Sequence, residues 1–127
     1  MAFKKQLQLD SDYTAECIRL RSYRVDYDTQ EAFGILKIYK DAAVAARGSK
    51  TATHQVMKVR LFGPAFAAYF GKAAKAAAKE AGLSIEAEAL LYRAAKEHPE
   101  LTWSDFDKPD PADPTKIIRG LQGAEDA

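Results

Sequence analysis

Residues 64–81 read PAFAAYFGKAAKAAAKEA, an alanine-rich stretch that begins with aromatic side chains. Its apolar residues recur at steps of three and four, which is the spacing of one helical face. We therefore expect one helix over 64–81, with Lys72, Lys75 and Lys79 on its other side. Gly71 inside a helix costs about 1 kcal/mol relative to alanine, so we expect a close packing contact there. The apolar face comprises Phe66, Tyr69, Phe70, Ala73, Ala74, Ala77, Ala78 and Ala81.

The chain before this helix reads as short strands. Apolar and polar residues alternate over 2–9 and over 55–62, which is the period of a half-buried β-strand. Residues 28–31 predict a hairpin loop that leads into a further strand over 32–40. That strand has apolar side chains on both faces, which predicts a central strand or one covered on both sides. Residues 41–48 then predict a single helical turn.

The stretch over 13–27 is long for one strand, and its apolar positions change face. Ile18 and Leu20 share one parity, whereas Tyr23 and Val25 have the other. A continuous strand cannot change faces without an extra residue. We therefore expect a β-bulge or a break near residues 21–22.

The chain after the alanine-rich helix predicts a second helix and a tail. Ser84 is a good N-cap for that helix, and Pro99 ends it. Residues 101–127 include the run KPDPADP, whose prolines predict an extended linker. A short helix over 113–121 is the alternative for part of this tail.

The order of the elements, strands first and helices afterwards, predicts an α+β fold. We expect an antiparallel β-meander of about four strands, followed by two helices and an extended C-terminal tail. Residues 1–100 would form the α+β domain, and residues 101–127 would form the Pro/Asp-rich tail. Removal of the tail is then expected to leave the domain folded.

The composition restricts the class of protein. The chain has 127 residues and a net charge of +1, from 19 basic and 18 acidic residues, which argues against a general polyanion binder. Cys17 is the one cysteine, so no intrachain disulfide can form. No apolar run approaches the roughly 20 residues that a bilayer span needs, and the first residues alternate rather than form a signal peptide. We therefore expect a soluble protein made in a reducing compartment, with no membrane partner.

The residues that usually carry chemistry form no recognisable site in the sequence. A nucleophile needs a base that a third group holds, whereas Cys17 lies in a strand pattern typical of a small buried hydrophobe. His54 and His98 lack the spacing of a catalytic triad or a zinc motif. A group of C-terminal aspartates lacks the glycine and the terminal glutamate of an EF-hand. Those aspartates are Asp105, Asp107, Asp110 and Asp113. We expect no catalytic residue, no metal and no cofactor.

Two sets of side chains are candidates for binding. Basic residues of the predicted first helix and of the strand over 13–27 could hold phosphates, although lysines on the wet face of a helix are the ordinary case. Large apolar residues in the tail could dock onto a neighbour or cap the core of the domain itself. The phosphate set is Lys72, Lys75 and Lys79, with Arg19, Arg21 and Arg24. The partner set is Trp103, Phe106, Ile117, Ile118 and Leu121.

The N-terminal half carries motifs that resemble a known family. The chain opens with MAFKKQLQL and continues over 23–48 with YRVDYDTQEAFGILKIYKDAAVAARG. Over residues 1–62 it resembles small structural proteins encoded among the tail and tail-fibre genes of tailed bacteriophages. The matching positions are Phe3, Lys4 and Lys5, then 25–28, and then Tyr39, Asp41, Ala46, Arg47 and Gly48.

This resemblance implies a non-enzymatic structural or adaptor protein of a phage particle, associated with the tail, the tail fibre or the neck. Such a protein acts through protein–protein contacts with other virion proteins, in several copies, after synthesis in the bacterial host cytoplasm. The resemblance supplies no functional residues. The alternative is a nucleic-acid-associated protein that uses the lysine-rich helix face. Deletion of 101–127 is expected to abolish assembly into the particle.

Overall fold

The computed structural model describes residues 2–10 and 13–126. The strands are β1 (Phe3–Gln8), β2 (Thr14–Asp26), β3 (Glu31–Tyr39), β4 (Val56–Phe62), β5 (Thr102–Ser104), β6 (Lys108–Pro109), β7 (Ile117–Ile118) and β8 (Glu125–Asp126). The helices are α1 (Ala42–Ala45), α2 (Pro64–Phe70), α3 (Lys72–Glu80) and α4 (Ala87–Glu97), with short 3₁₀ turns η1 (Ser49–Thr51) and η2 (Pro99–Leu101).

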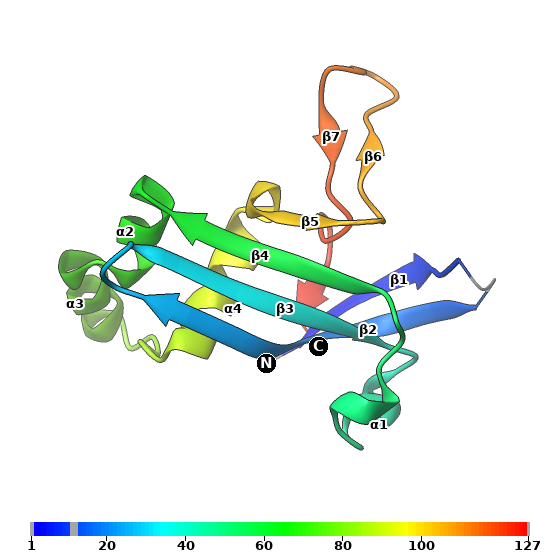
Figure 1. Cartoon of the computed structure of the whole chain (residues 1–127), viewed down its shortest axis with the longest axis horizontal. Coiled ribbons are helices and arrows are strands. Elements are labelled where there is room, and N and C mark those ends of the chain that lie inside the picture. The colour runs from blue at the N-terminus through cyan, green and yellow to red at the C-terminus, as the bar shows by residue number, and fades with distance from the viewer. Residues whose placement is uncertain (1, 11–12, 127) are drawn as a thin grey trace.

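The main element is a curled antiparallel sheet, so the α+β class is confirmed (Figure 1). In the described residues it has six strands in the order β5-β4-β3-β2-β1-β8. The expected meander is present as β1 to β4, but about four strands is an undercount, because β5 and β8 extend the sheet at its two edges. Phe3 pairs with Asp126, so the two ends of the chain lie side by side.

The change of face within β2 has the cause that the sequence indicates. The pairing of β2 with β3 shifts register between Leu20 and Ser22, which confirms a bulge at Arg21. The Arg21 side chain turns toward α1, where Nε donates to the Tyr39 hydroxyl at 2.7 Å and Nη2 donates to the Ala45 carbonyl at 2.6 Å. The bulge therefore accounts for the change of face along β2, and its arginine side chain holds α1 against the sheet.

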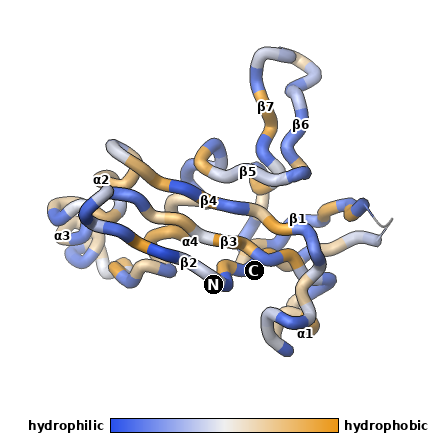
Figure 2. The backbone as a smooth tube through the Cα atoms, viewed as in Figure 1, coloured by the Kyte–Doolittle hydropathy of each residue, from blue (hydrophilic) through white to orange (hydrophobic). Residues whose placement is uncertain are grey.

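One face of the sheet packs against α4 and α2, and the main core lies between these layers. Hydropathy alternates along the strands that supply this face (Figure 2). Gly34 lies at the centre of β3, where an added Cβ would stand 2.7 Å from Leu20 Cδ1 and 3.6 Å from Leu91 Cδ1. The glycine therefore leaves the space that the Leu20 side chain of β2 occupies. β3 is a central strand, as expected.

The helix expected over 64–81 is broken into α2 and α3, so that prediction is wrong. Gly71 adopts an extended backbone with ψ of 153°, and a Cβ there would lie 2.5 Å from the Ala67 carbonyl oxygen. Of the alanines in α3, only Ala78 is buried. The alanine face therefore does not admit a neighbouring element, whereas the aromatic residues of α2 are buried as expected.

The second helix is confirmed as α4, which ends just before Pro99. Its N-terminus differs from the expectation, because Glu86 occupies the N-cap position and Ser84 Oγ instead accepts the Glu86 amide at 3.3 Å. Ser84 therefore shapes the connecting loop two residues earlier. None of the helices in the described residues combines the length and apolarity that a membrane span requires.

Residues 101–126 do not form the extended C-terminal tail that was expected over 101–127. β5 pairs with β4, β8 pairs with β1, and β6 and β7 form a separate hairpin that projects from the sheet (Figure 1). The alternative of a short helix over 113–121 is also wrong, because that segment contains β7. Without this segment, β1 and β4 would expose unpaired backbone N–H and C=O groups at the two sheet edges. β8 and β5 form hydrogen bonds with these groups, so the segment is held on the sheet.

Candidate functional site

The sheet face opposite α4 carries the most prominent group of exposed side chains. We call it the open face, because in the described residues no helix covers its centre. α1 covers only one end of it, where Tyr39 and Cys17 are buried against Ala45. The open face comprises Arg19, Ser22, Arg24 and Asp26 of β2, Glu31, Phe33, Ile35 and Lys37 of β3, Val56, Lys58, Arg60 and Phe62 of β4, and Trp103 of β5.

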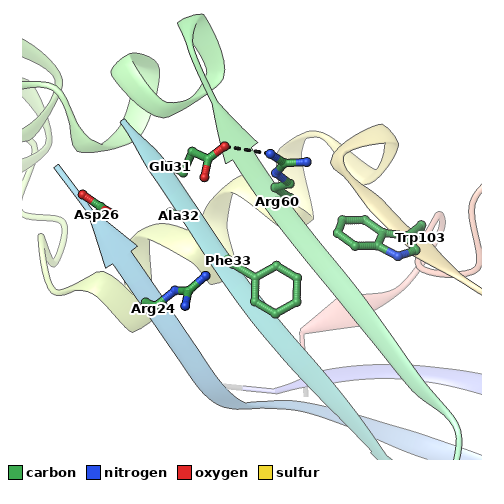
Figure 3. A pocket seen from close by; sticks show the side chains of 7 residues that line it. All are labelled: Arg24, Asp26, Glu31, Ala32, Phe33, Arg60 and Trp103. Atoms are coloured by element: carbon green, nitrogen blue, oxygen red, sulfur yellow. Dashed lines mark hydrogen bonds and ion pairs between the residues drawn. The ribbon is translucent and has the colours of Figure 1, made fainter. Parts of the chain in front are cut away.

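A shallow hollow of about 290 Å³ lies at one end of the open face (Figure 3). Phe33 forms its floor, and the Phe33 and Trp103 rings lie 6.1 Å apart between centroids. Arg60 donates to Glu31 Oε1 at 2.7 Å across the strands. Figure 3 shows Arg24 on the neighbouring strand beside the Phe33 ring. The hollow thus combines an aromatic floor with walls that carry two arginines and two carboxylates, and aromatic residues and arginine are enriched at binding surfaces.

Trp103 is the central aromatic residue of this site. It lines the hollow described above and two further ones, toward His54 and Lys58 and toward Phe62. Its side chain is 38% exposed although it stands on a paired strand. Backbone pairing with β4 therefore holds the indole in place, and a large part of its surface stays free for a partner.

The structure separates the five residues expected to bind a partner. Trp103 lies on the open face, and Ile117 is 56% exposed on the β6–β7 hairpin, with the less exposed Ile118 beside it. Phe106 packs against the main core, and Leu121 belongs to that core with 2% exposure. The partner role for Leu121 is therefore wrong, because its side chain has no free surface.

The C-terminal aspartates organise turns. Asp107 accepts hydrogen bonds from the amides of Ser104 and Gly120 and pairs with Arg119 at 3.0 Å, which closes the base of the hairpin. Asp110 and Asp113 accept backbone amides within the hairpin loop. In the described part of the chain, no group of three or more His, Cys, Asp or Glu side chains is placed to hold a metal ion.

The lysines of α3 do not form a shared phosphate site. Lys75 lies over the Tyr27 ring at 4.7 Å and donates to the Tyr27 hydroxyl, so it secures the β2–β3 turn against the helices. Lys72 and Lys79 are exposed. Of the arginines grouped with them, Arg21 is bound to α1, whereas Arg19 and Arg24 lie on the open face.

Cys17 and the histidines lie in different environments. Cys17 is buried beside Tyr39, as expected of a small hydrophobe, and burial raises the pKa of its thiol. His54 lies 3.0 Å from Asp10 on an exposed part of the surface. His98 is the residue that follows α4 and lies 3.1 Å from Glu100. These contacts bring no histidine to the thiol.

The strongest shifts of pKa belong to contacts that hold the fold together. Burial and a hydrogen bond to Glu97 raise the pKa of Tyr69. Burial and a hydrogen bond to Asp126 raise the pKa of Tyr92, whose hydroxyl lies between Asp126 and the Ala2 carbonyl. Both tyrosines fix α4 to its neighbours and lie away from the open face.

Sequence reasoning missed most of the open face. It predicted alternation over 55–62 and apolar side chains on both faces of the strand over 32–40, but it did not place the outer faces of these two strands side by side. The missing information is the β3–β4 register, which sets Phe33 opposite Arg60 and Ile35 opposite Lys58. The apolar side chains on the second face of β3 were the feature of the sequence that could have indicated the open face.

Comparisons with protein-family models, with curated proteins and with solved structures found no match for this chain.

Proposed function

We propose that this chain is a non-enzymatic structural or adaptor protein of a tailed-phage particle, associated with the tail, the tail fibre or the neck. It works in several copies through contacts with other virion proteins, after synthesis in the bacterial host cytoplasm. The motifs of residues 1–62 supply the phage context. The observation that carries the mode of action is the open face, where Trp103, Phe62 and Phe33 present aromatic surface to solvent.

The exposed residues of the open face include the aromatic and arginine side chains that often bind protein partners. Trp103 and Phe62 are 38% and 58% exposed, respectively. Arg60 lines a hollow with both of them, and its guanidinium lies 5.1 Å from the Phe62 ring. Tryptophan and arginine dominate the energetics of protein interfaces, whereas single exposed leucines do not. The projecting hairpin with Ile117 offers a second contact point.

The alternative is a nucleic-acid-associated protein that uses Lys72, Lys75 and Lys79. It has less support, because the contact of Lys75 with Tyr27 removes one of the three lysines from a shared phosphate site.

Mass spectrometry of purified particles tests the proposal. We expect the chain among the virion proteins, and we expect Trp103→Ala to reduce its incorporation while the purified variant keeps its circular dichroism spectrum. Leu83→Ala is the matched control, since Leu83 is a large apolar residue with 48% exposure outside the open face. Absence of the chain from particles that contain all other tail proteins would contradict the proposal.

A further inference from the structure

The open face is organised in rows that run across the strands. Arg24, Phe33 and Arg60 are direct neighbours on β2, β3 and β4. Two residues further along β3, Ile35 lies opposite Ser22 and Lys58, and Trp103 lies beside Lys58 on β5. Successive rows on one face are about 6.8 Å apart, because alternate residues of a strand share a face.

The next row places two cations directly opposite each other. Arg19 of β2 pairs with Lys37 of β3, and Val56 follows on β4. Like charges at directly opposed positions destabilise a sheet. Within residues 2–10 and 13–126, neither side chain has an ion pair. An anionic partner would remove this repulsion.

Charge on the open face is strongly unequal although the chain is almost neutral. Its carboxylates, Asp26 and Glu31, lie at one end, and Glu31 is already paired with Arg60. The remaining rows hold Arg19, Arg24, Lys37 and Lys58, of which Lys58 shares a hollow at the sheet edge with Asp10 and Asp105. The charge that complements this surface is negative, and it should be spread over three rows.

The apolar residues favour an acidic protein over a nucleic acid. Ile35 occupies the middle of the face, and an aliphatic side chain offers no flat surface for base stacking. Asp26 and Glu31 would repel a phosphate chain that continued along β3 beyond the Arg24 row. A protein strand, in contrast, can turn every second side chain toward the sheet, and carboxylates and apolar residues can take turns at these positions, which are about 6.8 Å apart.

We propose that the open face binds an extended, acidic protein segment whose sheet-facing side chains, every second residue, are in turn carboxylate and apolar. Its carboxylates meet Arg19, Lys37, Arg24 and Lys58, and its apolar residues meet Ile35 and the Phe33–Trp103 pair. This inference rests on the proposed function, because it names the kind of virion protein surface that an adaptor of this shape takes.

The single tryptophan of the chain lies in this site, so its fluorescence reports binding directly. The probe is a synthetic peptide of about eight residues, roughly 27 Å when extended, in which every second residue is in turn glutamate and valine or phenylalanine, with serine at the positions between them. Its matched control has glutamine in place of every glutamate. We expect the acidic peptide to bind at least about tenfold more tightly than the control, and we expect added salt to reduce that difference.

Charge variants locate the contact. Arg19→Gln together with Lys37→Gln should weaken binding of the acidic peptide about tenfold, and it should not lower the melting temperature, since it removes a repulsive pair. Lys72→Gln together with Lys79→Gln on α3 is the control and should leave the affinity unchanged.

Three results would overturn the inference. The first is equal affinity of the chain for the acidic peptide and its glutamine control, and the second is an equal loss of affinity for the acidic peptide in the α3 control variant. The third is tighter binding of a single-stranded oligothymidylate of the same charge, which would identify a nucleic acid as the ligand. These outcomes are separate from failure of the proposed function, because mass spectrometry of particles detects the chain whatever the open face binds.

Discussion

Leu121→Ala tests whether the C-terminal segment is part of the folded core. Leu121 is 2% exposed within the main core, whereas Ile117, four positions earlier, is 56% exposed on the hairpin. Truncation of a buried leucine to alanine removes about 2–5 kcal/mol from the free energy of unfolding. Since a domain of this kind is stable by about 5–15 kcal/mol, the loss is a large fraction of the total. The melting temperature should fall by roughly 10 °C.

Ile117→Ala is the matched control, because it also removes a branched aliphatic side chain from the same segment. An exposed position usually changes stability by less than about 0.5 kcal/mol. Urea unfolding followed by circular dichroism, with Trp103 fluorescence as a second probe, measures both variants. Equal small effects of the two substitutions would refute the placement of Leu121 in the core, and the segment would then behave as the detached tail that its prolines indicate.

Three further predictions follow from the fold. Deletion of 102–127 should leave an unfolded or aggregated chain in size-exclusion chromatography, because it strips strands from both sheet edges; a compact monomer with a native spectrum would contradict this. Gly71→Ala should lower the free energy of unfolding by about 1–3 kcal/mol in urea, since its Cβ meets the Ala67 carbonyl; unchanged stability would show that the break between α2 and α3 is not required. The hydrogen bond from Lys96 lowers the pKa of Asp126 below 3.8, so its stabilisation is complete above that pH and is lost as the pH falls through the lowered pKa; NMR titration should show the β1–β8 pairing weaken on acidification in the native chain and not in Asp126→Asn.

Local patterns were sufficient for much of the sheet. The parity change in the stretch over 13–27 predicted the bulge at Arg21, and the two-sided apolarity of β3 predicted its central place. Both follow from a period of two along one strand, which needs no knowledge of distant residues. The break at Gly71 was missed because helix propensity assigns glycine only a modest cost, whereas the conformation depends on how α2 and α3 pack on neighbours such as Tyr27.

The C-terminal segment could not be placed from its composition. The first two residues of KPDPADP form β6, and the rest lies in the irregular loop at the tip of a hairpin whose base is closed by Asp107 and Arg119. The Lys5 ammonium on β1 donates to the carbonyls of Gly120 and Gln122. Such contacts join residues more than a hundred positions apart, so no local pattern contains them.

Site-specific photo-crosslinking tests whether the open face contacts another virion protein in the assembled particle. A photoreactive amino acid replaces Ile35, at the middle of the open face, or Leu83, which is exposed elsewhere. After expression during phage infection and irradiation, mass spectrometry identifies the adducts in purified particles. We expect a crosslink from position 35 to an acidic segment of another virion protein and none from position 83. Crosslinks from position 83 alone, or no adduct at position 35 in particles that contain the chain, would contradict it.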